Sequence, residues 1–270
     1  MAEAAAAFGV YRRLVGARIR SQLQYRLSFA LSVTGVALVT FLDFAVILVI
    51  FGQIDALAGW SVAEVAFLYA VSSLAFALTD LAIGHLDLLP RMIRKGDLDA
   101  MLTRPLGSLF QVVAADFALR RLGRVLQALV VLAVAIALLE IPWTAGRVAM
   151  LVVMVVAGAA IFAGVWIAFA TIAFWLVDSM EVANAFTYGG SFLGQYPIAI
   201  FGAWLRRFVI FVVPIAFVAY FPSLYVLDKP DTLGMPAALQ VASPLVGAVS
   251  LLAGWLVWQN AVRHYRSTGS

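Results

Sequence analysis

Long, unbroken runs of apolar residues constrain this chain more than any other feature of its sequence. Crossing roughly 30 Å of hydrocarbon requires about 20 apolar residues in a helix. Each run contains at most two ionisable residues, and most runs reach or approach this length. The runs span residues 27–51, 62–84, 125–141, 148–177 and 241–258. They predict helices that cross a lipid bilayer.

The pattern inside these runs favours helices over the strands of a membrane barrel. Barrel strands alternate apolar and polar residues over about 10 positions, whereas Ala45 to Phe51 is apolar throughout. Composition agrees, because 64% of the residues are hydrophobic and 12% are charged. Soluble domains average roughly 45–50% apolar and about 25% charged residues. We therefore predict an all-α, polytopic membrane bundle, formed by one domain over residues 1–270.

The basic residues predict which side of the membrane holds each end of the chain. Lys and Arg concentrate in the cytoplasmic loops of membrane proteins. Most of the 18 basic residues precede the first run, lie between the second and third runs, or follow the last run. Both termini are therefore expected in the cytoplasm. This requires an even number of crossings, and we predict six transmembrane helices.

The sixth crossing must come from the segment between the fourth and fifth runs, where two arrangements are possible. One arrangement crosses at 182–201 and adds a re-entrant hairpin through 203–222. The other crosses at 208–222 and leaves Arg206 and Arg207 in the cytoplasm, as the charge rule favours. The residues alone leave both arrangements open.

Residues 1–25 form the first of two cytoplasmic segments with a distinctive pattern. Arginines alternate there with apolar residues near helical spacing. This pattern predicts an amphipathic helix that lies in the inner membrane interface. A solvated lead-in to the first span is the alternative.

The second cytoplasmic segment is the connection 85–107. Gly96 can end one helix and Asp97 can cap the next, so we predict a short helix over 98–103. A compact helix between two spans suits the docking of a soluble partner, and an ordinary ordered loop is an equal alternative.

The third run is expected to be the outer part of a longer helix. Pro105 suits the first turn of a helix, and the chain from Pro105 to Glu140 can remain helical. Such a helix is roughly 54 Å long at 1.5 Å per residue. It would protrude into the cytoplasm with Arg120, Arg121 and Arg124 on the protruding part.

Asp43 is the carboxylate that lies well within a predicted span. A carboxylate in lipid is costly, so Asp43 should face the bundle interior or water. Contact with a cationic substrate, transfer of a proton and a structural hydrogen bond are its expected roles. Asp80 and Glu140 fall near span ends, where we expect solvated carboxylates.

Several classes of function lack the residues that they need. The chain has no cysteine and no Gly-x-x-x-x-Gly-Lys-Ser/Thr loop, so it offers neither a thiolate metal site nor a P-loop for ATP. His85 and His264 are too far apart in sequence to suggest a metal motif. We predict no catalytic residue, metal or cofactor on this chain.

Two blocks of sequence resemble a known family. Residues 96–106 read Gly-Asp-Leu-Asp-Ala-Met-Leu-Thr-Arg-Pro-Leu, which resembles the G-x-L-D-x-x-L-x-R-P-L signature of a bacterial branch of ABC-2 type transporter permeases. Residues 196–201 and 213–222 resemble the fifth-span region of that branch. The resemblance covers essentially the whole chain.

This resemblance implies the permease subunit of an ATP-driven exporter in the bacterial plasma (inner) membrane. The subunit would move a hydrophobic or amphipathic substrate out of the cell by alternating access. A separate ABC ATPase in two copies would hold ATP and Mg, and a second permease would be a related but different chain. No nucleic-acid partner is expected. The alternative is a secondary carrier, or a scaffold subunit without an ATPase.

The resemblance also implies roles for individual segments. It makes 1–25 the elbow helix and 85–107 the coupling loop, and it favours the hairpin through 203–222. Residues expected to couple to the ATPase are Asp97, Leu98, Asp99, Met101, Leu102, Arg104 and Pro105, with the three apolar side chains in an ATPase groove. Residues expected in the substrate pathway are Asp43, Phe44, Phe192 and Tyr196.

Overall fold

A computed structural model describes residues 16, 24, 26–115, 118–176 and 180–265. The described residues form helices joined by turns, with a single isolated bridge between Leu57 and Trp60. The predicted all-α bundle is therefore confirmed. The predicted elbow helix over 1–25 lies outside the described residues, apart from Gly16 and Gln24.

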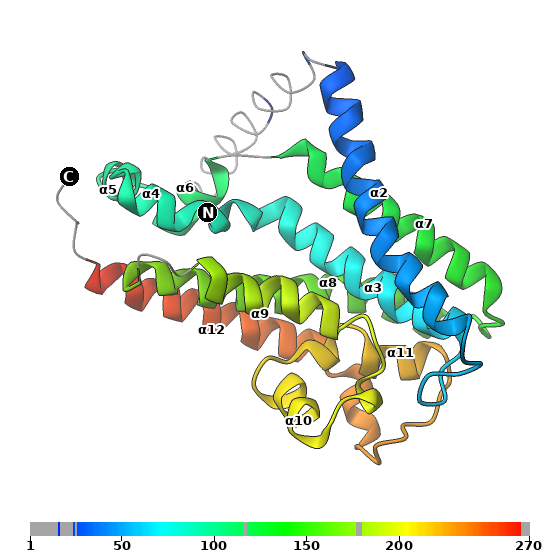
Figure 1. Cartoon of the computed structure of the whole chain (residues 1–270). Coiled ribbons are helices and arrows are strands. Elements are labelled where there is room, and N and C mark those ends of the chain that lie inside the picture. Colours follow the sequence, from blue (N-terminus) through cyan, green and yellow to red (C-terminus); the bar gives the residue numbers. More distant parts are fainter. Residues whose placement is uncertain (1–15, 17–23, 25, 116–117, 177–179, 266–270) are drawn as a thin grey trace.

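The helices lie side by side in an elongated bundle (Figure 1). The α-helices are α2 (Arg26–Phe51), α3 (Val62–Ile83), α4 (Leu89–Arg94), α5 (Asp97–Leu102), α6 (Ser108–Ala114), α7 (Leu122–Leu138), α8 (Ala145–Ala170), α9 (Met180–Leu193), α10 (Ala203–Phe211), α11 (Tyr220–Val226) and α12 (Ser243–His264). Short 3-10 turns occupy Gly84–Leu88, Leu119–Arg121, Thr171–Phe174, Ile198–Ile200, Ile215–Phe217 and Ala237–Val241.

Five helices of the described chain are long and apolar enough to cross a membrane: α2, α3, α7, α8 and α12, three of them extended by the turns or short helix beside them. Each coincides with one of the predicted apolar runs to within a few residues, although α12 continues to His264. A bent pair, α10 and α11, raises the possible number of spans to six. The chain is therefore a multi-pass membrane protein.

The two ends of the bundle differ in charge. One end of the bundle contains the last turns of α3 and α12 together with α4 and α5. Arg91, Lys95 and Arg104 are exposed there. At the opposite end, the basic residues Arg147 and Lys229 pair with Asp228 at 3.0 Å and Glu64 at 2.9 Å. The positive-inside rule therefore predicts that the α4–α5 end is the cytoplasmic end, although Arg206 and Arg207 of α10 count against this distribution.

Glycines allow close helix packing between α8 and α12. A side chain at Gly164 would collide with the backbone of Ser250 and Leu251, and one at Gly254 would collide with the backbone of Gly164. Small residues let two backbones approach in lipid, where van der Waals contact drives association. The same effect brings α7 against α2, because a side chain at Gly123 would collide with the carbonyl of Val33.

The long helix predicted from Pro105 to Glu140 is wrong. The chain forms α6, which ends at Ala114, and then a separate α7, which begins at Leu122. The helical axis changes direction between them (Figure 1). Leu119 is buried while Arg121 turns toward α3, so tertiary contacts of this stretch take precedence over helical continuity.

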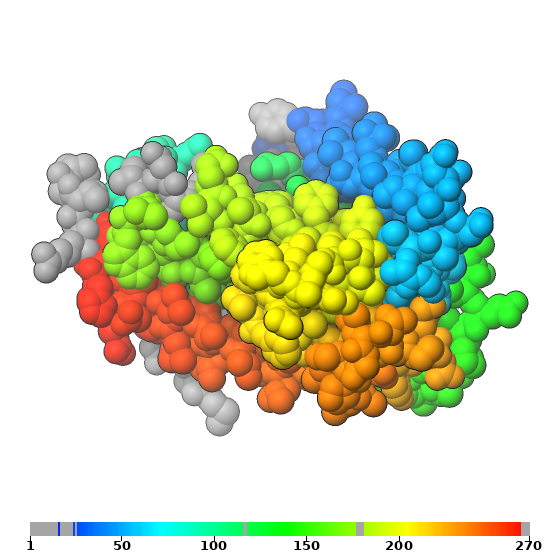
Figure 2. Space-filling view, turned by 60° about the horizontal axis from the view of Figure 1, so that its bottom comes forward, coloured from blue at the N-terminus to red at the C-terminus, as the bar shows by residue number. Residues whose placement is uncertain are grey.

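The predicted crossing at 182–201 is only partly helical. α9 has 14 residues and ends at Leu193, so it is about 21 Å long and shorter than the hydrocarbon core. The chain then continues through Tyr196 and Pro197 to a turn over Ile198–Ile200. Figure 2 shows the following segment as a lobe beside α9 and α12.

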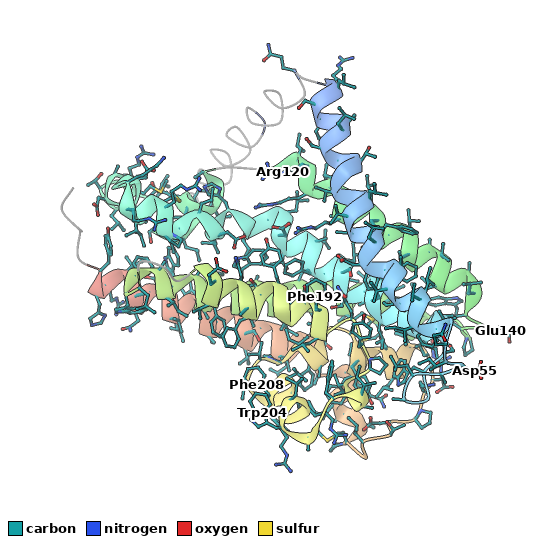
Figure 3. The ribbon with its side chains drawn as sticks, viewed as in Figure 1. Asp55, Arg120, Glu140, Phe192, Trp204 and Phe208 are labelled. Carbon is teal, nitrogen blue, oxygen red and sulfur yellow. The ribbon has the colours of Figure 1, made fainter. Side chains whose placement is uncertain are left out.

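α10 and the segment Ile215–Val226 meet at a bend of 70°. Ile215, at the bend, packs near Gly190 and Gly194, and Val218 packs against Gly158 in the middle of α8. α11 returns toward the outer end, where Tyr225 lies beside Gly146. This course suits the predicted re-entrant hairpin, and a broken span has the same bend. Figure 3 shows Trp204 and Phe208 of α10, whose stacked rings have centroids 5.6 Å apart.

Candidate functional site: a charged cluster and a cavity between four helices

Asp80, near the cytoplasmic end of α3, is the centre of a buried ion cluster. Its side chain is 1% exposed and forms ion pairs with two arginines. Nε of Arg121 lies 3.1 Å from Oδ1, and Nη1 of Arg124 lies 2.8 Å from Oδ2. Arg121 also donates to the Asp80 carbonyl at 3.0 Å. The expectation that Asp80 is a solvated end residue is therefore wrong.

The cluster requires a glycine one turn further along the chain. A Cβ atom at Gly84 would collide with the Asp80 carboxylate and the Arg121 guanidinium. The backbone N–H of Gly84 also donates to the Asp80 carbonyl. Only a residue without a side chain leaves room for Arg121 to reach Asp80.

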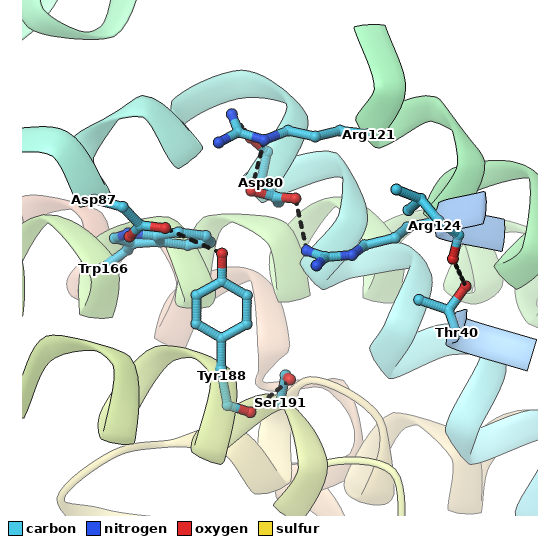
Figure 4. A network of polar contacts seen from close by, with 9 residues as sticks. Thr40, Asp80, Asp87, Arg121, Arg124, Trp166, Tyr188 and Ser191 are labelled. Atoms are coloured by element: carbon cyan, nitrogen blue, oxygen red, sulfur yellow. Dashed lines mark hydrogen bonds and ion pairs between the residues drawn. The ribbon is translucent and has the colours of Figure 1, made fainter. Parts of the chain in front are cut away.

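Asp87 forms a second polar centre beside the first (Figure 4). Trp166 of α8 donates its indole N–H to Oδ1 of Asp87 at 2.9 Å, and the Tyr188 hydroxyl of α9 donates to Oδ2 at 3.0 Å. The guanidinium of Arg124 lies 5.7 Å from the centre of the Tyr188 ring. Arg124 and Tyr188 thus connect the two centres and join α3, α7, α8 and α9.

Sequence reasoning missed this cluster. The sequence placed Asp80, Arg121 and Arg124 near the cytoplasmic ends of their predicted spans. It therefore indicated that opposite charges lie at a similar depth in the membrane. The sequence does not say which helices are neighbours. The 41 and 44 residues between Asp80 and its partners hide the pairing.

Below this cluster, the described residues enclose a cavity of about 110 Å³ between α2, α3, α7 and α9. Its wall consists of Val39, Thr40, Asp43, Tyr69, Ser73, Phe76, Arg124, Gln127, Tyr188, Ser191, Phe192 and Gln195. Most of these side chains are polar or aromatic, which is unusual for helices that otherwise pack apolar residues. The cavity can therefore hold a polar ligand group or several waters.

Hydrogen bonds fix the wall of the cavity. The Tyr69 hydroxyl donates to the carbonyl of Thr40 at 2.9 Å, and Gln127 donates to the same hydroxyl oxygen at 3.3 Å. Tyr69 therefore connects α2, α3 and α7. The ring of Phe44 lies 5.2 Å from the ring of Tyr69 and supports it from behind.

The structure brings together two of the four residues predicted for the substrate pathway. Asp43 and Phe192 both line the cavity. Phe44 is 8% exposed and packs behind the wall, and Tyr196 follows the lining residue Gln195 without being part of the lining. A pathway role for these four residues remains a prediction.

The short helix predicted over 98–103 is present as α5, and its coupling role remains a prediction. Gly96 has φ +71 and separates α4 from α5, as predicted. Gly96, rather than Asp97, is the N-cap residue, and no side chain caps this helix. Gln111 of α6 donates to the carbonyls of Met101 and Leu106 at 2.9 and 2.8 Å, which ties the end of α5 to α6.

The predicted coupling residues fall into two groups. Leu98 is 0% exposed and packs inside this chain, so the expectation that it inserts into a partner is wrong. Met101 and Asp99 are partly buried, and burial together with the adjacent Asp99 carboxylate raises the pKa of Tyr265. The exposed residues are Asp97, Leu102, Arg104 and Pro105.

A groove of about 530 Å³ runs beside α5. Arg91, Lys95 and Arg104 line it together with Asp97 and Met101. The exposed face of α5 therefore presents an apolar tip, Leu102, next to a mainly basic groove.

No group of three or more His, Cys, Asp or Glu residues that could hold a metal occurs in the part of the chain that the structure describes. A family model described as an ABC-2 family transporter protein matches residues 37–269. Comparison with curated proteins and with solved structures gives no match.

Proposed function

Because this chain belongs to the ABC-2 transporter family and is a membrane permease subunit of an ABC transporter, we propose that it is the transmembrane half of an ATP-driven exporter. The permease itself is a transport component and not a catalyst. A separate ATPase chain in two copies holds ATP and Mg and supplies the energy. The complex resides in the bacterial inner membrane.

The α4–α5 segment is the observation that carries the ATPase partnership. Its position at the basic end of the bundle places it in the cytoplasm, where an ATPase is found. Leu102, Arg104 and Pro105 are exposed on it, beside the groove that contains Arg91 and Lys95. An apolar tip within a charged rim is the arrangement expected of a small docking surface.

Alternating access follows from this arrangement. α5 is tied to α6 by Gln111 and follows α4, which is joined to α3 by the turn Gly84–Leu88. Asp80 lies in the last turn of α3, and Asp87 lies in the turn Gly84–Leu88. Movement of α5 by the ATPase would therefore be transmitted to α3 and to the helices that Arg124 and Tyr188 join to it. The cavity between α2, α3, α7 and α9 lies directly beside those contacts.

A second permease completes the transport unit, and we propose a related but different chain. α2 exposes most of its apolar side chains, including Leu31, Leu38 and Leu42. Lipid or a second permease can cover this surface. We propose a hydrophobic or amphipathic substrate, because the cavity is bounded by α2, whose apolar side chains are exposed.

Affinity purification of the tagged chain from its native membrane in mild detergent tests the proposal. We expect a P-loop ATPase in stoichiometric amount, and a second permease beside it. As a matched pair, Leu102→Asp should lose the ATPase while Ile54→Asp, in the exposed loop between α2 and α3, should keep it. Recovery of this chain without an ATPase, even after crosslinking, would overturn the proposal in favour of a secondary carrier or a scaffold.

A further inference from the structure

The groove of about 530 Å³ beside α5 combines basic side chains with an apolar lining. Arg91, Lys95 and Arg104 supply its positive charges, and all three residues are exposed. Asp97 is the carboxylate among the described lining residues. The apolar part of the lining consists of Leu88, Met92, Ala100, Met101 and Ala115. The groove therefore carries excess positive charge beside an apolar surface.

These three basic residues come from separate elements of the fold. Arg91 lies in α4, Lys95 is the C-cap residue of α4, and Arg104 follows α5. The ion pairs of the described chain are formed by other basic residues, around Asp80 and at the opposite end of the bundle. Like charges repel one another, so their convergence on one groove without ion-pair partners suits an anionic ligand.

The length of α3 places this groove at the level of the lipid head groups. α3 has 22 residues, so it is about 33 Å long and covers a hydrocarbon core of roughly 30 Å. The turn Gly84–Leu88 and α4 follow it directly, at the end of the bundle (Figure 1). With its head groups, a bilayer is about 40–45 Å thick. The turn and α4 therefore lie in the head-group layer or at its edge.

The chemistry of the groove fits a phospholipid better than a small anion. A guanidinium group donates two parallel hydrogen bonds to a phosphate, and an ammonium group adds a point charge. Basic pockets at the ends of transmembrane helices bind anionic lipid head groups. A free phosphate ion would leave the apolar side chains Leu88 and Met92 without a partner, whereas the glycerol and upper acyl groups of a lipid would cover them.

We propose that this groove binds the phosphate head group of an anionic phospholipid, with Arg91, Lys95 and Arg104 as its counter-charges. The proposal goes beyond the transport function and does not require an ATPase, because it rests on the charge of the groove and its level in the membrane. Leu102, the proposed ATPase contact, is not among the residues that line the groove. Lipid and ATPase would thus occupy neighbouring surfaces of the α4–α5 segment.

Native mass spectrometry of the full chain in mild detergent, titrated with dioleoylphosphatidylglycerol, tests this proposal. We expect one such lipid to remain bound under conditions where the zwitterionic dioleoylphosphatidylcholine dissociates. The double variant Arg91→Gln/Arg104→Gln should bind roughly 25-fold more weakly, since each basic residue near a membrane surface contributes about 1 kcal/mol. Arg263→Gln removes an exposed charge at the same end of the bundle, in the last turn of α12, and should bind as the wild type does.

Size-exclusion profiles identify any variant that fails to fold. Lys95→Gln is the milder alternative to the double variant, with an expected loss of about fivefold. Equal retention of the two lipids, unchanged binding in folded groove variants, or an equal loss in Arg263→Gln would overturn the proposal. A double variant that loses the ATPase but keeps the lipid would show that the groove belongs to the protein interface instead.

Inorganic phosphate distinguishes a lipid from a soluble phosphate compound. It should displace dioleoylphosphatidylglycerol only weakly, because it has no apolar part to contact the lining. Displacement by phosphate as effective as that by excess lipid would assign the groove to a soluble ligand and refute the lipid site. Co-purification of the ATPase with the wild type is a separate measurement, so failure of the lipid site leaves the transport proposal intact.

Discussion

Asp80 of α3 and Arg124 of α7 form an ion pair of 2.8 Å across 44 residues of sequence. The pair lies where the cytoplasmic cluster meets the cavity, since Arg124 contributes to both. Asp80 is also bound by Arg121. One buried carboxylate therefore ties the beginning of α7 to the end of α3.

Removal of the Asp80 carboxylate should destabilise the protein more than removal of either arginine. Asp80→Ala leaves two guanidinium groups without their partner, at a cost of about 3 kcal/mol or more. Arg124→Gln should cost less, because Arg121 still neutralises Asp80. Thermal unfolding in detergent measures both, with Asp55→Ala in the exposed loop as the control. Equal stability of Asp80→Ala and the control would contradict this role.

Gly84→Ala should disrupt the same cluster without changing any charge. The added methyl group would occupy the space between the Asp80 carboxylate and the Arg121 guanidinium, so the pair must separate. Gly35→Ala is the matched control, because nothing lies within 4 Å of the added atom and alanine favours the helix. We expect a lower unfolding temperature for Gly84→Ala only. A Gly84→Ala protein as stable as Gly35→Ala would show that the close approach is unimportant.

Gly164→Ala should separate α8 from α12. Alanine is the better helix former, yet here its methyl group would meet the backbone of Ser250 and Leu251. Overpacking of this kind costs about 1–3 kcal/mol. Denaturant titration in detergent, compared with Gly189→Ala on an open face of α9, measures the difference. Stabilisation by both substitutions would argue against tight packing of α8 on α12.

Leu98→Asp and Leu102→Asp should fail in different ways, although both are on α5. Leu98 is fully buried, so a carboxylate there would disrupt the fold around α5. Leu102 is 38% exposed, so its substitution should leave the protein folded and remove ATPase binding. Size-exclusion profiles report folding, and co-purification reports binding. ATPase binding by a folded Leu102→Asp variant would exclude this tip from the interface.

The local features of the sequence were sufficient for five of the apolar helices. The lengths of the apolar runs predicted α2, α3, α7, α8 and α12, because the thickness of the bilayer sets helix length. Gly96 was recognised between two short helices because a left-handed backbone favours glycine. The basic residues allow a prediction of the cytoplasmic end because their distribution, unlike packing, can be counted along the chain, and that orientation stays a prediction.

Other properties depended on partners that are distant in sequence. In the sequence, Asp80 looks like a residue at the end of a span and Leu98 looks like a surface residue. Both are buried because α7 and the neighbouring helices pack against them. The break between α6 and α7 likewise reflects contacts of Leu119 and Arg121 rather than a helix-breaking residue.

The sequence by itself determined five apolar helices long enough to cross the membrane, because transfer to lipid depends on the composition of each segment. Only the tertiary structure decided that Asp43 shares a cavity with Phe192, and that Arg124 meets Asp80. Those contacts depend on which helices are neighbours and how they are rotated. In lipid this choice is made by close packing and buried polar pairs.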